Sequence, residues 1–314
     1  MEDKSGSSFR LRGADFSYRY FHQCFIIGFV IVVIAVMSLI SESFRTAYNY
    51  GNLMNSCFAL MLAAFGQFLV ILTGDIDISV GSMVALGNCL SAYIMTVMPT
   101  GTGAVLAVLA TLAAGLLCGA LNGVFVAVFR LPAIIVTIAG SAIFKGIALI
   151  LMPEPGGTVH GGFSKVLTWK AARLVPMSFF LMVICIVFLV ILTNRTSFGK
   201  SLRAVGGNES AAFGTGVRVG RVRFSVYVLS GLLCAMSGQY LSARTSCGDA
   251  NIGNTYTVYS ISAAVVGGTL MTGAVGEAYG TACGALVIYL INSILNMLDV
   301  STFYQYACQG AVLI

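Results

Sequence analysis

Long apolar runs recur through most of the 314-residue sequence and limit what the chain can fold into. Crossing about 30 Å of hydrocarbon takes roughly 20 residues, because an α-helix rises about 1.5 Å per residue. Candidate runs are 21–40, 53–72, 78–98, 104–129, 131–152, 174–193, 224–241, 256–275, 278–298 and 302–314. The sequence therefore predicts an all-α, multi-pass membrane protein with about ten transmembrane helices.

The composition and the two ends of the chain fit this prediction. Hydrophobic residues make up 58% of the sequence and charged residues 9%, whereas soluble proteins have about 25% charge. The first run exceeds the apolar core of a secretory signal and no small-residue cleavage site follows it. We therefore expect residues 1–20 to be a tail and 21–314 the transmembrane domain. The last run spans only about 20 Å as a helix, so it is either short or truncated.

Basic residues predict the orientation, because cationic loops near span ends stay in the cytoplasm. The loop at about 194–223 carries a single acid, Glu209, against six basic residues: Arg195, Lys200, Arg203, Arg218, Arg221 and Arg223. Ten crossings place this loop, the amino terminus and Arg130 in the cytoplasm. On the outside they leave Arg45, Lys165, Lys170, Arg173 and Arg244.

No pattern in the sequence favours an enzyme, a metal site or a nucleic-acid site. The nine cysteines include no C-x-x-C pair, and His22 and His160 are isolated. The stretch NRTSFGKS ends like a phosphate-binding loop but has Asn194 where that motif needs its first glycine. The net charge of +6 is explained by topology. We expect a non-enzyme that binds no metal, cofactor or nucleic acid and that contacts membrane lipid.

Glycines at intervals of four predict two close helix contacts, in GLLCGALNG (115–123) and GEAYGTACG (276–284). Each stretch belongs to a similar sequence of two apolar helices with a short break. Five helices apart, the two units would have opposite orientation, which suggests an inverted repeat of five plus five helices. Chance similarity between two helices rich in Ala and Gly is an equal alternative.

Four segments resemble one family, the permease subunits of bacterial ABC importers for ribose and related monosaccharides. They are TGDIDISVGSMVALG, LNGVFVAVFRLPAIIVTIAGSAIFKGIALI, TSFGKSLRAVGGNESAAFGTGV and YSISAAVVGGTLMTGAVGEAYGTACGALV. The resemblance covers most of residues 53–314. Its most specific parts are the G-x-I-D-I-S-V-G block, with Asp77, Ser79 and Gly81, and the stretch AVGGNESAA.

The resemblance implies a ten-helix fold like that of type II importers, in the bacterial inner membrane. It implies a homodimer or heterodimer of permease subunits that forms the translocation path. A separate cytoplasmic ABC ATPase would use ATP, and a periplasmic sugar-binding protein would deliver ribose or a sugar-like molecule. The alternative from another class is an ion-coupled secondary sugar transporter or facilitator, which would need a buried titrating pair.

An external ATPase needs a contact on the permease, and the glycine-rich basic loop is the candidate. We expect the contact at Gly206, Gly207, Asn208, Glu209, Ser210, Ala211, Ala212 and Gly216. A short helix is predicted there, with Asn208 as its N-cap and Gly214 or Gly216 ending it. An ordinary solvated loop is the alternative.

Asp77 lies just before an apolar run, so we expect it to act as an N-cap near the cytoplasmic face, unless this segment is re-entrant. A role in substrate binding is the less favoured alternative. Asp75 is expected to be a solvated partner of cytoplasmic cations.

Polar residues within the spans are candidates for the translocation path. Lys145 either snorkels outward or faces a wet path or a neighbouring helix, and the sequence leaves both open. Asn88, Asn122, Asn292 and Asn296 offer neutral donors and acceptors to sugar hydroxyls, although hydrogen bonding between helices explains them equally well.

Overall fold

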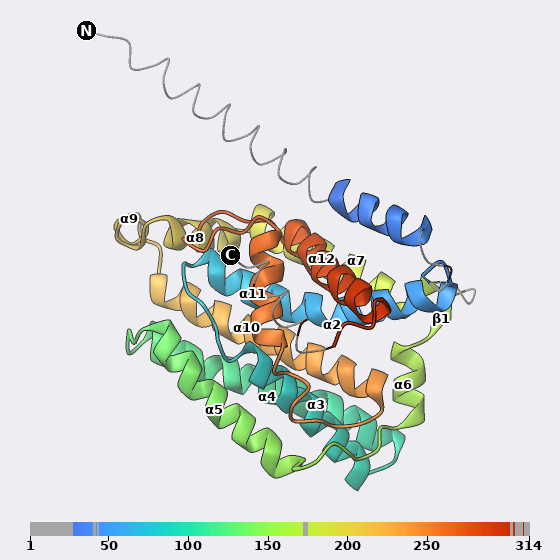
Figure 1. The fold of residues 1–314 in the computed structure, drawn as a ribbon. Coiled ribbons are helices and arrows are strands. Elements are labelled where there is room, and N and C mark those ends of the chain that lie inside the picture. The colour runs from blue at the N-terminus through green and yellow to red at the C-terminus, as the bar shows by residue number, and fades with distance from the viewer. Residues whose placement is uncertain are drawn as a thin grey trace.

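The computed structural model describes residues 28–39, 42, 44–171, 175–301, 304 and 310. This part of the chain is mainly helical (Figure 1). After a helix at Gly28–Leu39 come α2 (Ala47–Leu72), α3 (Val80–Val97), α4 (Gly101–Ala127), α5 (Ala133–Leu151) and α6 (Gly161–Leu167). A small hairpin of β1 (Lys170–Ala171) and β2 (Val175–Pro176) leads to α7 (Met177–Arg195), α8 (Ser197–Gly207) and α9 (Glu209–Gly214). The last helices are α10 (Val219–Thr245), α11 (Tyr256–Val266) and α12 (Ala278–Met297).

Seven of the described helices are long and apolar enough to cross a membrane, namely α2, α3, α4, α5, α7, α10 and α12. This supports a multi-pass membrane protein. The predicted tail 1–20 and nearly all of the predicted span 302–314 lie outside the described residues.

The prediction of one span at 256–275 is wrong, because α11 ends at Val266 after 11 residues. The chain then turns rather than continuing as a helix. Gly268 and Gly273 have φ of 88° and 89°, a conformation that cannot belong to a right-handed helix. The sequence window was apolar enough, but these glycines end the helix.

The centre of the bundle is α10, which packs against α2, α3 and α4. The predicted glycine contacts are present. A Cβ atom added at Gly119 would lie 2.3 Å from the carbonyl oxygen of Tyr227 on α10. One added at Gly284 would lie 2.0 Å from the carbonyl oxygen of Ala263 on α11. Glycine is needed at both positions because the helix backbones touch.

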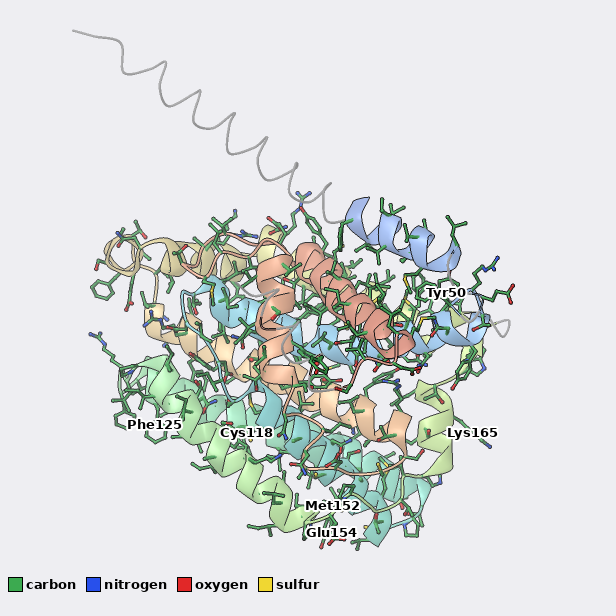
Figure 2. The ribbon with its side chains drawn as sticks, in the orientation of Figure 1. Tyr50, Cys118, Phe125, Met152, Glu154 and Lys165 are labelled. Carbon is green, nitrogen blue, oxygen red and sulfur yellow. The ribbon has the colours of Figure 1, made fainter. Side chains whose placement is uncertain are left out.

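Hydrogen bonds show that α2 and α10 run in opposite directions. The hydroxyl of Ser237 donates to the carbonyl of Ala59 at 2.6 Å, and that of Tyr240 donates to the Asn55 side chain at 3.0 Å. We call the end of the bundle with α8 and α9 the basic end, and the end with α6 and the β-hairpin the hairpin end. In Figure 2, Phe125 lies toward the basic end and Lys165 at the hairpin end.

Two helices begin inside the bundle, and their first turns lie side by side. At the start of α3, the Gly81 amide donates to the Thr257 hydroxyl on α11 at 3.2 Å. The Thr257 hydroxyl in turn donates to the carbonyl of Ile78 at 3.3 Å. A Cβ atom at Gly81 would lie 2.3 Å from the carbonyl oxygen of Gly253. The segments before α3 and α11, residues 73–79 and 246–255, therefore carry non-helical backbone into the bundle.

Candidate functional site

The basic end carries a pair of short helices between α7 and α10. Asn208 ends α8 and caps α9, where its side-chain oxygen accepts the amide of Ala211 at 2.9 Å. α9 ends at Gly214, and Gly216 follows with φ of 86°. The predicted capped helix is confirmed. The predicted loop at about 194–223 was too long, because α10 already begins at Val219.

The end of α8 rests on two other parts of the backbone. A Cβ atom at Gly206 would lie 1.9 Å from the carbonyl oxygen of Leu72 and 2.7 Å from the amide of Ala274. These two groups are joined by a hydrogen bond of 3.0 Å. α8 therefore touches both the end of α2 and the segment before α12. At Gly207 the nearest atom would be 3.6 Å away, an ordinary contact.

Arg203 links α8 to the start of α12. Its guanidinium lies 3.3 Å from the Glu277 carboxylate and donates to the Asn194 side chain at 2.8 Å. It also donates to the carbonyl of Ala274 at 3.3 Å. The side chains of Arg203 and Glu277 are 22% and 14% exposed, so solvent screens this pair only partly.

Arg223 links α9, the segment 73–79 and α10. It lies 3.5 Å from the carboxylate of Asp75 and 3.0 Å from that of Glu209. Burial raises the pKa of Asp75, and the positive charge of Arg223 opposes this shift. The cationic partner expected for Asp75 is present, but its side chain is only 14% exposed, so the expectation of a solvated residue is wrong.

The outer surface of α9 is exposed, although Ala212 is buried against the bundle. Phe213 was not predicted as a site residue, yet 72% of this side chain is exposed. The sequence signal that could have identified Phe213 is an aromatic residue within a short helix that has a predicted N-cap. Exposed large apolar groups on a rigid element are typical of protein contacts.

The G-x-I-D-I-S-V-G block forms a buried polar cluster. The Asp77 carboxylate accepts the amide and the hydroxyl of Ser79 at 2.8 and 2.6 Å. The Asn122 amide also donates to that hydroxyl, at 2.8 Å. With its amide oriented to satisfy both groups, Gln67 bonds the backbone amide and carbonyl of Asp77.

The expected capping role of Asp77 is confirmed. Its carboxylate accepts the amide of Ser79 just before α3 begins at Val80, whereas the Ser79 side chain makes no capping hydrogen bond. Asp77 is fully buried and level with Gln67, more than one turn before the end of α2. The segment therefore turns back into the bundle, where buried partners for its backbone compensate the loss of water.

Lys145 contacts the neighbouring segment 246–255 and is not paired with Asp77. Its ammonium group donates to the carbonyl of Ala250 and, at 2.9 Å each, to the side-chain oxygens of Asn251 and Asn254. The buried titrating pair that an ion-coupled transporter would need is thus not formed between Lys145 and Asp77. The sequence analysis did not single out the two asparagines, whose signal was three polar residues within six, namely Asp249, Asn251 and Asn254.

The amides predicted for a translocation path lie in different surroundings. Asn88 is fully buried and accepts the amide of Asp249 at 2.7 Å. Asn122 is equally buried. On α12, Asn292 is 8% exposed and Asn296 is exposed. Asn88 and Asn122 therefore join segments within the chain, and the path role of all four stays a prediction.

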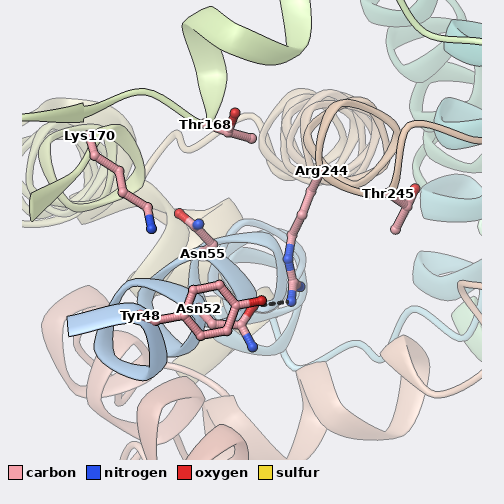
Figure 3. A pocket seen from close by; sticks show the side chains of 7 residues that line it. All are labelled: Tyr48, Asn52, Asn55, Thr168, Lys170, Arg244 and Thr245. Carbon is pink, nitrogen blue, oxygen red and sulfur yellow. Dashed lines mark hydrogen bonds between the residues drawn. The ribbon is translucent and has the colours of Figure 1, made fainter. Parts of the chain in front are cut away.

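A polar pocket of about 500 Å³ opens at the hairpin end (Figure 3). Arg244 donates to the Asn52 side chain at 2.9 Å, and the Lys170 ammonium lies 5.5 Å from the centre of the Tyr48 ring. The other lining residues are Asn55, Thr168 and Thr245. Two cations beside amides and hydroxyls form a surface that suits a carboxylate.

The long apolar helices define a multi-pass membrane protein. Among the described residues, no group of His, Cys, Asp and Glu could hold a metal ion. The family described as the branched-chain amino acid transport system permease component matches residues 49–314. The chain belongs to this family of transport permeases.

Comparison with curated proteins identifies more specific relatives within this class. The chain is 35% identical to the ribose import permease protein RbsC of Bacillus subtilis, over 92% of this chain and 89% of the relative. It is 33% identical to RbsC of Escherichia coli K12 over 91% and 89%. The xylose transport system permease protein XylH of E. coli K12 is 28% identical over 91% and 88%. No solved structure matches.

Proposed function

We propose that this chain is the transmembrane subunit of an ATP-driven importer for ribose or a similar monosaccharide. The observation that carries the proposal is the α8–α9 loop, held rigidly against three spans in a permease whose relatives import ribose and xylose. This chain itself lacks the glycine pattern of a nucleotide-binding loop, so a separate subunit hydrolyses ATP.

The contact with the ATPase is the exposed side of α8 and α9, from Gly206 to Gly216, with Phe213 as its apolar anchor. Movement of the ATPase would displace α9 and α8 together. Gly206 touches backbone groups of α2 and of the segment before α12. Arg203 and Arg223 also bind α8 and α9 to the start of α12 and to α10. A displacement of α8 and α9 therefore moves the spans with them. Asp77, Ser79 and Gly81 hold the start of α3 in place.

The full domain has about ten transmembrane helices in two inverted halves. Two observations support this proposal. α2 packs on α11 and α12, and α10 packs on α3 and α4 in the same way. α2 and α10 run in opposite directions, and the helices α3 and α11 start beside each other inside the bundle.

The complete importer contains a second permease subunit, identical or related, and lies in the bacterial inner membrane. The amino terminus and the basic end face the cytoplasm, which the cluster of basic residues there favours. A periplasmic sugar-binding protein docks at the hairpin end, where Lys170 and Arg244 offer positive charge to its carboxylates. The chain itself needs no cofactor.

The test is reconstitution of the purified complex in vesicles, with uptake of labelled ribose measured against internal sugar. We expect uptake only with ATP and with the binding protein present. Phe213→Ala should release the ATPase during purification, and mass spectrometry of the co-purifying proteins would detect that loss.

Trp169→Ala is the matched control, because this aromatic side chain is also exposed, at 56%, but lies at the hairpin end. It should keep the ATPase in full amount. Sugar uptake by the chain alone in vesicles without ATP would refute the proposal and establish the ion-coupled or facilitated alternative.

A further inference from the structure

Three polar side chains share one outward-facing patch on the bundle. Asn251 and Asn254 are exposed, and Lys145 between them is half-buried. We call Lys145, Asn251 and Asn254 the amide patch. Its two parts come from α5 and from the non-helical segment 246–255, so the patch exists only in the folded chain.

The amide patch lies well inside the membrane-spanning part of the molecule. Lys145 is six residues before the end of α5 at Leu151, about 9 Å along the helix axis. The segment that carries the asparagines continues inward from there, until Gly253 touches the backbone of Gly81. The patch therefore lies at hydrocarbon depth in the half nearer the hairpin end.

Such a surface cannot face lipid. Non-helical backbone at this depth is stable only where it is covered by protein or lines water, and exposed charges and amides are costly in hydrocarbon. The other side of α5 has the opposite character. Ile143 and Ile147, two residues before and after Lys145, are 50% and 41% exposed and suit contact with lipid chains.

We propose that the amide patch lines the water-filled sugar path, where the amide nitrogens of Asn251 and Asn254 donate hydrogen bonds to sugar hydroxyls. Lys145 acts as a positioning residue. It binds the side-chain oxygen of each asparagine, so each NH₂ group remains available as a donor. Neutral donors suit transient passage, because hydrogen bonds exchanged with water contribute little net affinity.

This inference rests on the proposed function, since a path beside the amide patch needs a second permease subunit as its opposite wall. It adds that Asn251, Asn254 and Lys145 form the outer part of the sugar contact, whereas the buried amides of Asn88 and Asn122 do not reach that surface.

The first experiment measures water access by reaction of introduced cysteines with a membrane-impermeant cationic methanethiosulfonate. Asn251→Cys and Asn254→Cys are compared with Ile147→Cys in the assembled complex, in a Cys247→Ser background that retains uptake. We expect both patch positions to react about tenfold faster than position 147, because only a hydrated thiol ionises. Ribose should slow the reaction at the patch.

The second experiment is Asn254→Asp, which keeps the oxygen bound by Lys145 and removes the NH₂ donor. We expect the uptake efficiency, as maximal rate over KM, to fall about three- to tenfold. The melting temperature should not fall, because the contact between residue 254 and Lys145 is kept. If Asn254 served only as a structural partner of Lys145, the uptake efficiency would not fall, because an aspartate strengthens the contact with Lys145.

The outcomes separate the two proposals. Failure of the wild-type complex to import any monosaccharide refutes the proposed function, and the labelling rates still test whether the patch faces water. If the wild type imports ribose but the patch cysteines react no faster than position 147, the patch faces lipid or protein and the inference is wrong. Normal uptake by Asn254→Asp overturns the donor role.

Discussion

Gly206→Ala should uncouple ATP hydrolysis from transport. The added Cβ atom would lie 1.9 Å from the carbonyl oxygen of Leu72, whereas ordinary contacts begin near 3.4 Å. Because the neighbour is backbone, no side-chain rotation relieves the overlap, and α8 must move by about 1.5 Å. Overpacking of this kind costs about 1–3 kcal/mol, more than the roughly 1 kcal/mol that alanine gains over glycine in a helix.

The overlap disturbs the contact between α8 and the end of α2, through which motion of α9 would reach the spans. If it raises the barrier of the driven step by about 1–3 kcal/mol, ribose uptake slows roughly 5- to 150-fold. The assay compares ATP-dependent uptake with ATP hydrolysis by the same vesicles. We expect hydrolysis to continue, so that fewer sugar molecules enter for each ATP.

Gly207→Ala is the matched control, because its Cβ atom would lie 3.6 Å from the nearest atom. It should transport like the wild type and unfold at the same temperature or slightly higher. Equal coupling in the two variants would refute the reasoning, since only the position of one carbon atom distinguishes them.

Three further variants test the packing through stability in detergent. Arg203→Ala leaves the largely buried Glu277 carboxylate without its cation and should lower the unfolding free energy by about 1–3 kcal/mol, seen by thermal unfolding. Asn208→Ala removes the α9 cap, worth about 1 kcal/mol, and hydrogen exchange at the Ala211 amide should quicken. Gly119→Ala would place a Cβ atom 2.3 Å from a carbonyl oxygen of α10, so its unfolding temperature should fall.

Matched controls exist for these variants. Glu42→Gln removes an ion pair whose carboxylate is 96% exposed, so the unfolding temperature should not change. Gly146→Ala meets no atom within 4 Å and should be neutral or stabilising. A loss of stability in Gly146→Ala as large as in Gly119→Ala would contradict the close approach of α4 and α10.

Local sequence patterns predicted much of the fold. The long apolar helices, the glycine contacts of α4 and α12 and the Asn208 cap each depend on residues near one another in the chain. Local patterns gave wrong predictions where contacts between distant segments determine the structure. The run 256–275 has the hydropathy of a span, but its glycines turn after α11.

The candidate site was predicted only in part, for the same reason. Hydropathy placed Asp77 at a membrane face, because the sequence does not show how deep a non-helical segment enters. Its depth depends on Gln67 and on the contact between the starts of α3 and α11. Phe213 was overlooked because its exposure depends on how α9 sits on the bundle.

By itself, the sequence determined that this chain lies in a membrane, that its helices pack closely through glycine and that a basic helical loop leaves the bundle. Composition, periodicity and spacing are sufficient for these properties, because each is set within one or two helical turns. Only the tertiary structure decided that Lys145 holds Asn251 and Asn254, more than a hundred residues away. The reason is physical: which polar groups meet inside a bundle depends on the depth and direction of every packed segment.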